Sequence, residues 1–146
     1  MCPRRPPGAG PDLADDAWPA AWRDAAHVLQ ATWTDASLLD RPMQLPWATM
    51  PGAAVLATYV NEVTVHTWDL ARATGQTPEW DDDVVGVAFA AIREAMPAEG
   101  RAEAFEAVRD QLPPGIEWQP PFGPAVEVPD DAPLVERLVA WNGRTP

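Results

Sequence analysis

The chain lacks several features that mark common classes of protein. Its single cysteine, Cys2, excludes an internal disulfide and fits a reducing compartment, and at the chain end it is more plausibly incidental than catalytic. The longest apolar run is far below the ~20 residues that a membrane span requires. Residues 1–10 carry two arginines but no apolar stretch that would make a signal peptide. We therefore expect a cytoplasmic protein that has no membrane partner.

Basic residues are also scarce. Ten Lys/Arg stand against 22 Asp/Glu, the net charge is −12, and the basic residues are scattered along the chain. Because a nucleic-acid surface needs clustered positive charge, nucleic acid is not expected as a partner. Leu, Ile, Val and Phe together number only 28 of 146 residues, which with this charge is typical of disorder. Eight tryptophans favour instead a single packed helical domain with a marginal core.

The first part of the chain divides into a leader and a helix. Residues 1–16 are rich in Pro, Gly and Asp without periodicity, and we expect a disordered leader there. Residues 17–146 form the predicted helical domain. Apolar side chains recur at three- and four-residue spacing over residues 16–33, which predicts an amphipathic helix; they include Trp18, Trp22, Leu29 and Trp33.

The longest predicted helix covers residues 51–74. The preceding segment, 34–50, contains Pro42 and Pro46 and is expected to be an ordered loop. Thr49 is a plausible N-cap, and Gly75 suits the left-handed residue that ends a helix. We therefore expect this helix to be the best defined in the domain.

Three further helices complete an all-α prediction. Asp81 to Asp83 can cap a helix that runs to Met96, before Pro97. Another helix is expected over residues 101–111. Residues 124–129 form a small extended segment, too short for more than an edge strand. Asp130 or Asp131 is expected to cap a last helix through Trp141, which Gly143 ends.

Glu62 and His66 are the most informative residues of the sequence. On a helix, residues four apart lie on one face, one turn apart, and a carboxylate and an imidazole at that spacing can hold one divalent metal. A metal site needs three or four ligands, so this pair is half a site. The core stripe of the helix should include Leu56, Tyr59 or Val60, Val63 and Leu70, which would leave Glu62 and His66 at its border, pointing into one cavity.

Each of these residues also has an ordinary structural interpretation. An isolated pair of this kind is more often a half-buried histidine with a backbone partner beside an ordinary helix carboxylate. The other histidine, His27, is expected to be a surface residue rather than a ligand. Asp69 could orient the imidazole of His66 or pair with Arg72, and both remain open. Tyr59 and the tryptophans at 47, 68 and 141 are expected mainly to pack.

The residues around this pair resemble a known signature. The run Asn61-Glu62-Val63-Thr64-Val65-His66-Thr67-Trp68-Asp69-Leu70-Ala71-Arg72-Ala73-Thr74-Gly75 resembles the pattern E-x-x-x-H-x-W-D-L-A-x-A-x-G of an actinobacterial metal-binding family in the DinB-like superfamily. That superfamily includes the metal-binding N-terminal domain of mycothiol-dependent maleylpyruvate isomerase. The segment from Phe122 to Pro146 is similar to the C-terminal pattern of this family, so the resemblance covers about Trp18 to Pro146.

The resemblance implies a DinB-like four-helix bundle that holds a divalent metal, commonly zinc or nickel, through three side chains. Glu62 and His66 match two of these ligands. The third in relatives is a histidine on the first bundle helix, and nothing before Trp18 looks like that helix. The domain at residues 17–146 is therefore expected to be N-terminally incomplete and to lack the first helix of its bundle.

A three-ligand metal site leaves open positions for water or a thiolate. By resemblance, the expected function is thiol-dependent isomerisation or S-transfer, with mycothiol or a similar small thiol as cosubstrate. The alternative is a non-catalytic helical binding or interaction module with a degenerate metal site. A third interpretation is a homodimer in which two copies complete each other's bundle, because a bundle short of one helix would expose an apolar groove.

Overall fold

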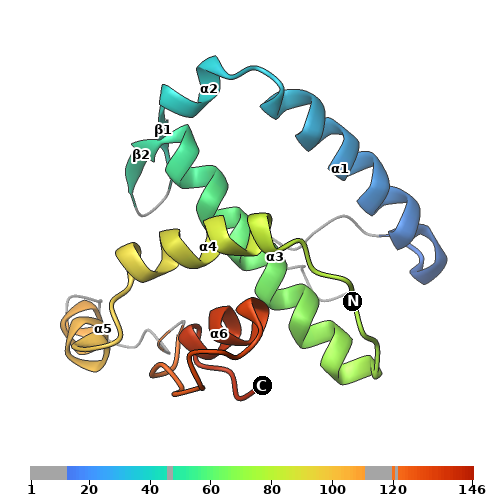
Figure 1. Cartoon of the computed structure of the whole chain (residues 1–146). Coiled ribbons are helices and arrows are strands. Elements are labelled where there is room, and N and C mark those ends of the chain that lie inside the picture. Colours follow the sequence, from blue (N-terminus) through green and yellow to red (C-terminus); the bar gives the residue numbers. More distant parts are fainter. Residues whose placement is uncertain (1–12, 46–47, 111–119, 121) are drawn as a thin grey trace, which may run out of the picture. The chain divides into compact units, whose positions relative to one another are not determined.

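The computed structural model describes residues 13–45, 48–110, 120 and 122–146 (Figure 1). The chain divides into two compact units, residues 1–40 and 41–146. Within the described residues the regular structure is helical apart from one two-stranded sheet, which confirms the all-α class. No described helix has the length and apolar character that crossing a membrane would need.

The first unit contains three short helical elements: η1 (Asp15–Ala17), α1 (Trp18–Trp33) and α2 (Ser37–Asp40). Helix α1 confirms the helix predicted over residues 16–33, and Pro19 occupies its first turn, where the missing N–H costs nothing. Most of the predicted leader lies outside the described residues, but Asp15 and Asp16 belong to η1. The Trp18 and Trp22 side chains are both exposed, and α1 contains no buried residue.

A β-hairpin replaces part of the loop predicted before the long helix. Strands β1 (Pro42–Gln44) and β2 (Thr49–Pro51) pair antiparallel, with Met43 opposite Met50. The prediction of Thr49 as N-cap was wrong, because Thr49 is the first residue of strand β2 and α3 has no side-chain hydrogen bond at its N-cap. Pro51 is the N-cap instead, in an extended conformation that leads the hairpin directly into the helix.

Helices α3 (Gly52–Thr74) and α4 (Asp82–Ala95) form the centre of the second unit. Helix α3 ends at Gly75, whose φ of 68° is left-handed and whose N–H donates to the Ala71 carbonyl, as predicted. Helix α4 begins at the predicted cap, since the Asp81 carboxylate accepts hydrogen bonds from the N–H groups of Asp83 and Val84.

The last part of the chain contains helices α5 (Arg101–Arg109) and α6 (Leu134–Trp141). The predicted aspartate cap of α6 was wrong: Pro133 is the N-cap, because the chain first makes a turn in which Ala132 N–H donates to Pro129 O. Residues 124–129, all described, form no strand. A hydrogen bond from Val126 N–H to Ala140 O connects this segment to α6.

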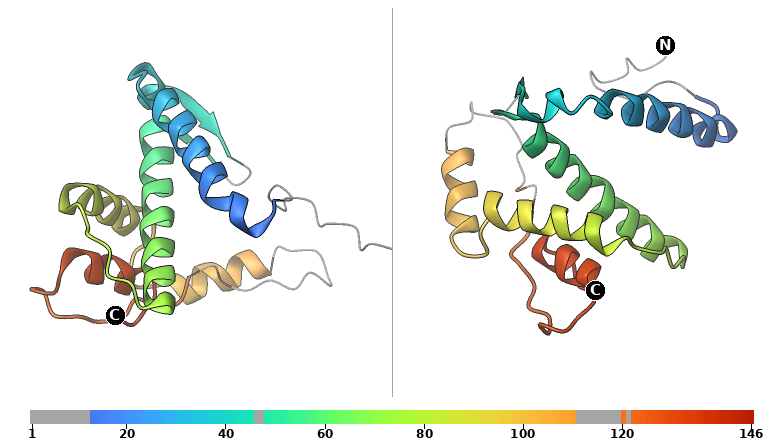
Figure 2. Two further views of the ribbon diagram at one scale, coloured as in Figure 1. Left: turned by 90° about the vertical axis from the view of Figure 1, so that its right-hand side faces the viewer. Right: turned by 45° about the horizontal axis from the view of Figure 1, so that its top comes forward.

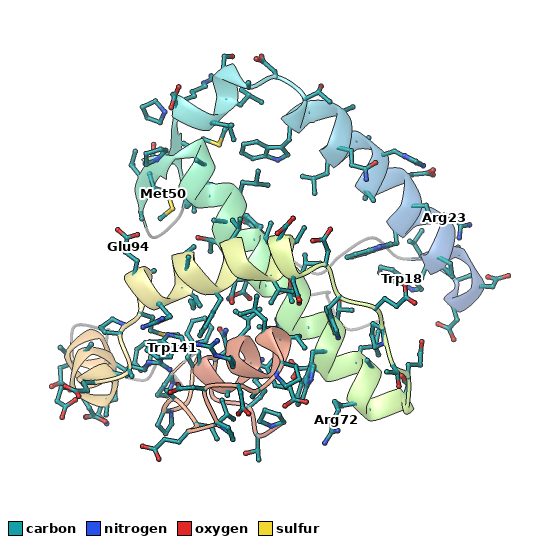
Figure 3. All side chains as sticks on the ribbon, in the orientation of Figure 1. Trp18, Arg23, Met50, Arg72, Glu94 and Trp141 are labelled. Atoms are coloured by element: carbon teal, nitrogen blue, oxygen red, sulfur yellow. The ribbon has the colours of Figure 1, made fainter. Side chains whose placement is uncertain are left out.

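The core of the second unit lies where α4 and α6 pack on the same side of α3 (Figure 2). Its buried members come from all three helices: Val65, Val85, Ala88, Phe89, Val135, Leu138 and Val139. Trp141 points from α6 toward α4 (Figure 3), and its ring meets Phe89 edge-on at a centroid distance of 6.1 Å. The expectation that Trp68 and Trp141 serve packing is met, since both pack against this core.

Two buried polar arrangements tie these helices together. Asn61 on α3 and Asn142 after α6 exchange side-chain hydrogen bonds of 2.9 and 3.2 Å. The Arg101 guanidinium is buried and donates to four backbone carbonyls, those of Met96, Pro97, Gly123 and Trp141. Neither arrangement was predicted from the sequence, because both depend on contacts between residues far apart in the chain.

Candidate functional site

Glu62 and His66 meet on α3, as their spacing predicts. The Glu62 Oε2 atom lies 3.5 Å from the His66 Nε2 atom. The His66 side chain is 65% exposed and the Glu62 side chain 39% exposed, so His66 faces solvent more than Glu62 does. The two donor atoms are close enough to contact one ion, and a single copy of the chain leaves that position open to solvent.

The prediction that both side chains point into one cavity was wrong. Glu62 lines a cavity of about 330 Å³ between α3, α4 and the segments around Phe105 and Phe122. His66 does not line this cavity. The physical reason is that the face of α3 that packs in the core is not the face that the apolar pattern predicted. His66 lies away from the buried face and is therefore exposed.

That different face is visible in the burial of α3. The residues it buries within the helix include Asn61, Thr64, Val65 and Ala71. Tyr59, Val63 and Leu70, which were expected in the core stripe, are exposed by 49%, 47% and 62%; of the expected stripe, Val60 does pack against the core. Helices α4 and α6 contact α3, and Tyr59, Val63 and Leu70 lie on the exposed face of α3 rather than in the core.

Asp69 fixes the orientation of the His66 ring. The His66 Nδ1 atom lies 3.3 Å from Asp69 Oδ2. Asp69 in turn accepts hydrogen bonds from Arg144, from Nη2 at 3.0 Å and from Nε at 3.3 Å. Arg72, the partner considered from sequence, instead stacks on Trp68, with its guanidinium carbon 5.4 Å from the ring centroid. Of the two roles left open for Asp69, the structure supports orientation of the imidazole.

The electrostatics of Asp69 agree with this role. Partial burial raises the pKa of the Asp69 carboxyl, but hydrogen bonding and charge from Arg144, together with the His66 contact, outweigh it and leave the pKa below its usual range. Asp69 therefore stays ionised at neutral pH and accepts a hydrogen bond from Nδ1 of His66. The other ring nitrogen of His66, Nε2, faces the Glu62 carboxylate.

Arg144 is the member of this group that sequence reasoning missed. It lies 75 positions from Asp69 in the chain, and both of its side-chain contacts to Asp69 depend on α6 folding back against α3. The sequence offers one signal, an isolated basic residue in the C-terminal pattern that resembles the metal-binding family. Nothing in local spacing pairs it with Asp69.

The remaining candidate ligands do not join Glu62 and His66. His27 is an exposed residue of α1 in the first unit, as expected. Cys2 and Trp47 lie outside the described residues. In the part of the chain that the structure describes, no group of three His, Cys, Asp or Glu side chains is arranged to hold a metal. Tyr59, whose hydroxyl could have faced a metal cavity, is exposed on the same outer side as His66.

The chain is similar to two proteins of Mycobacterium tuberculosis. One is an uncharacterised protein of strain CDC 1551 / Oshkosh and the other an uncharacterised protein of strain H37Rv, and each is 27% identical to this chain over 135 residues. The similarity covers 92% of this chain but 66% of each relative, so the chain spans about two thirds of the relatives' length. No family model matches the sequence, and no solved structure matches it.

The site therefore consists of two side chains that could act as metal ligands, Glu62 and His66, with Asp69 in contact with the His66 ring. A carboxylate oxygen and an imidazole nitrogen are suitable ligands for zinc and for nickel. The Asp69-His66 contact is the arrangement that metal-binding histidines typically have behind them. The donor set fits two positions of a divalent metal and leaves the others to water or to further ligands.

Proposed function

We propose that this protein binds a divalent metal ion, zinc or nickel, through the Glu62 carboxylate and the His66 Nε2 atom. The observation that carries the proposal is the series Arg144, Asp69, His66, Glu62, in which each side chain orients the next. Asp69 positions the imidazole from behind, so its free nitrogen faces the carboxylate that would share the ion.

The resemblance of residues 61–75 to a DinB-like metal-binding family adds a reaction to this proposal. A metal with open positions lowers the pKa of a bound water or thiol and so supplies a nucleophile at neutral pH. We propose that a small thiol such as mycothiol is the cosubstrate and that the reaction is an isomerisation or an S-transfer. In this function Glu62 and His66 bind the metal, and Asp69 and Arg144 are positioning residues.

A second candidate function is that of a non-catalytic helical interaction module. The observation that favours it is the row of exposed apolar residues on α3, Tyr59, Val63 and Leu70, beside a donor set that has only two described ligands. Such a surface is typical of a protein-protein contact. In this case metal affinity would be weak and no thiol chemistry would follow.

Metal analysis distinguishes the two candidates. The purified chain is loaded with zinc, dialysed and analysed for metal by mass spectrometry, alongside the His66→Ala variant and a His27→Ala control. We expect the parent and the control to retain zinc and His66→Ala to lose it, with circular dichroism unchanged because His66 contributes little to packing. Equal zinc in His66→Ala and the parent would contradict the metal site.

Activity is tested separately on the zinc-loaded protein. Isomerisation of maleylpyruvate in the presence of mycothiol should be lost in both His66→Ala and Glu62→Gln if the proposed reaction is correct. Metal retention without any thiol-dependent turnover would support the metal site and reject the reaction.

A further inference from the structure

A second cavity, of about 640 Å³, lies between α4, α6 and the segments at residues 98–99 and 124–130. Every described residue that lines it belongs to the second unit, residues 41–146. Its volume is in the range of pockets that hold small organic ligands. Glu62 and His66 are not among the described residues that line it, so this cavity is separate from the candidate metal site.

Helices α4 and α6 each contribute an aromatic residue and an arginine to the wall of this cavity. Phe89 and Arg93 come from α4, and Arg137 and Trp141 come from α6. In each pair the two residues are four positions apart and therefore share one face of their helix. The Phe89 ring belongs to the buried core cluster and meets the Trp141 ring edge-on, so this wall of the cavity is continuous with the core.

The two rings hold both guanidinium groups in place. The guanidinium carbon of Arg93 lies 5.5 Å from the Phe89 ring centroid and 5.3 Å from that of Trp141. The guanidinium carbon of Arg137 lies 5.4 Å from the same Phe89 centroid. The two guanidinium carbons are therefore at most 10.9 Å apart, which is 5.5 plus 5.4 Å. One small ligand can reach both.

The N–H donors of Arg93 and Arg137 are not used within the described part of the protein. Three other arginines of this unit donate to carboxylates or carbonyls, namely Arg101, Arg109 and Arg144. Arg93 and Arg137 form no ion pair and no side-chain hydrogen bond with another described residue. Contact with a ring uses no N–H group as a donor to an oxygen atom, so these donors are available to a bound acceptor.

We propose that this cavity binds a small organic acid with a single carboxylate and an apolar body. The Arg93 and Arg137 guanidiniums bind the carboxylate, because their planar N–H groups match its two oxygen atoms. The Phe89 ring, Val126 and Val128 line the same cavity and contact the apolar body. This ligand site is additional to the proposed metal site and does not depend on it.

Charge in the cavity restricts the ligand to one negative group. Three carboxylates also line the cavity, those of Glu99, Glu127 and Asp130. Direct contact with two guanidiniums favours one ligand carboxylate, because charge interactions weaken with distance. A phosphate ester or a dicarboxylate brings a second negative charge, and the described lining contains no third basic side chain to meet it. The lining carboxylates and the net charge of −12 repel that second charge.

The test is a titration of the full chain with phenylacetate, followed by NMR chemical shifts. Any metal is first removed with EDTA, which is then dialysed away. We expect phenylacetate to bind at one site per chain, and both uncharged phenylacetamide and the dianion phenyl phosphate to bind about tenfold or more weakly. Failure of phenylacetate to bind, or equal binding of the acid and the amide, would overturn the site. Tighter binding of phenyl phosphate would overturn the preference for a single charge. Because the protein is metal-free, each result is independent of the Glu62-His66 pair.

Substitution of the two arginines assigns the contact. Arg93→Gln and Arg137→Gln should each weaken phenylacetate binding by about tenfold, because each removes charged donors. Arg72→Gln is the matched control, since Arg72 also stacks on a ring but is not among the residues that line the cavity, and it should bind like the parent.

Circular dichroism shows whether each glutamine variant folds. If one does not, the lysine variant at that position replaces it, because lysine keeps the charge without the planar donor group and should still weaken binding. Unchanged affinity in the folded variants at both positions would contradict the proposal.

Discussion

At the scale of single residues, Asp69 connects the candidate site to the rest of the fold. It contacts His66 on its own helix and accepts two hydrogen bonds from Arg144 near the C-terminus. The orientation of His66 therefore depends on a residue that is remote in sequence. Changes at Asp69 or Arg144 should affect both metal binding and stability.

Asp69→Asn should lower zinc affinity by about 10- to 100-fold, because the amide orients His66 less firmly than the carboxylate does. Isothermal titration with zinc measures the change, and Glu79→Gln is a control that removes an exposed carboxylate elsewhere. If Asp69→Asn bound zinc as tightly as the parent, Asp69 would have no positioning role.

The same residue should contribute to stability in a pH-dependent way. Because the pKa of folded Asp69 lies below that of an unfolded aspartate, its contribution is complete above pH ~4 and is lost as pH falls through the folded value. Asp69 is about one third exposed, so we expect less than about 1 kcal/mol at pH 7. Urea unfolding of the metal-free parent and of Asp69→Asn should differ at pH 7 and converge toward pH 2. A constant difference across this range would contradict the assignment.

Arg101 has a purely structural role at the residue scale. Its guanidinium satisfies four carbonyls from the end of α4, the segment at Gly123 and the end of α6, and it stacks on Trp141. Burial lowers the pKa of this guanidinium. Of the four carbonyls, that of Met96 also accepts a hydrogen bond from the Trp141 indole N–H.

Arg101→Met should therefore destabilise the protein by about 2–4 kcal/mol, because it removes all four hydrogen bonds that the charged guanidinium donates to backbone carbonyls. Arg101→Lys should cost less, since an ammonium still supplies three donors. Arg109→Met is the control, because Arg109 is exposed on α5. The free energy of unfolding in urea gives all three values, and an effect of Arg101→Met no larger than that of the control would refute the role.

At the scale of elements, the packing of α3 against α6 depends on a buried amide pair. Asn61 and Asn142 are each 1–2% exposed and satisfy one another, and Asn142 also donates to Leu138 O. A buried pair of this kind favours one relative position of the two helices, because a shift would break both hydrogen bonds between the buried amides.

Asn61→Ala and Asn142→Ala should each lower the free energy of unfolding by about 1–3 kcal/mol, and the double variant should cost less than the sum. Asn142→Ala should be the more costly, because the bond to Leu138 is also lost. Gln76→Ala, which removes an exposed amide, is the control and should have little effect. Strict additivity in urea unfolding would show that the two amides are not coupled.

At the scale of the whole molecule, all residues of the hydrophobic core cluster belong to the unit at residues 41–146. Helix α1 of the first unit buries none of its residues. The second unit therefore contains the packed hydrophobic core on which cooperative unfolding depends.

A chain restricted to residues 41–146 should accordingly fold. We expect it to be helical by circular dichroism and to unfold in urea in one cooperative transition. The full chain measured in parallel is the reference. Loss of the cooperative transition would show that the first 40 residues are needed for the core.

The helices and the proximity of Glu62 and His66 could be predicted from the sequence alone. Periodicity and local capping determine α1, α3 and α4, and the four-residue spacing brings Glu62 and His66 together on one turn. These features depend on contacts between near neighbours in the chain. The β-hairpin at residues 42–51 and the turn before α6 were missed, because their short segments carry weak local signals.

Which face of α3 is buried could not be predicted from the sequence and depends on how the helices pack. Tyr59, Val63 and Leu70 look like core residues in the sequence, yet α4 and α6 pack on the side that carries Asn61, Thr64 and Val65. That choice places His66 outside, and the return of the C-terminal segment brings Arg144 to Asp69. Burial and long-range pairing depend on how helices distant in sequence fit together, and helical periodicity alone contains no information about that fit.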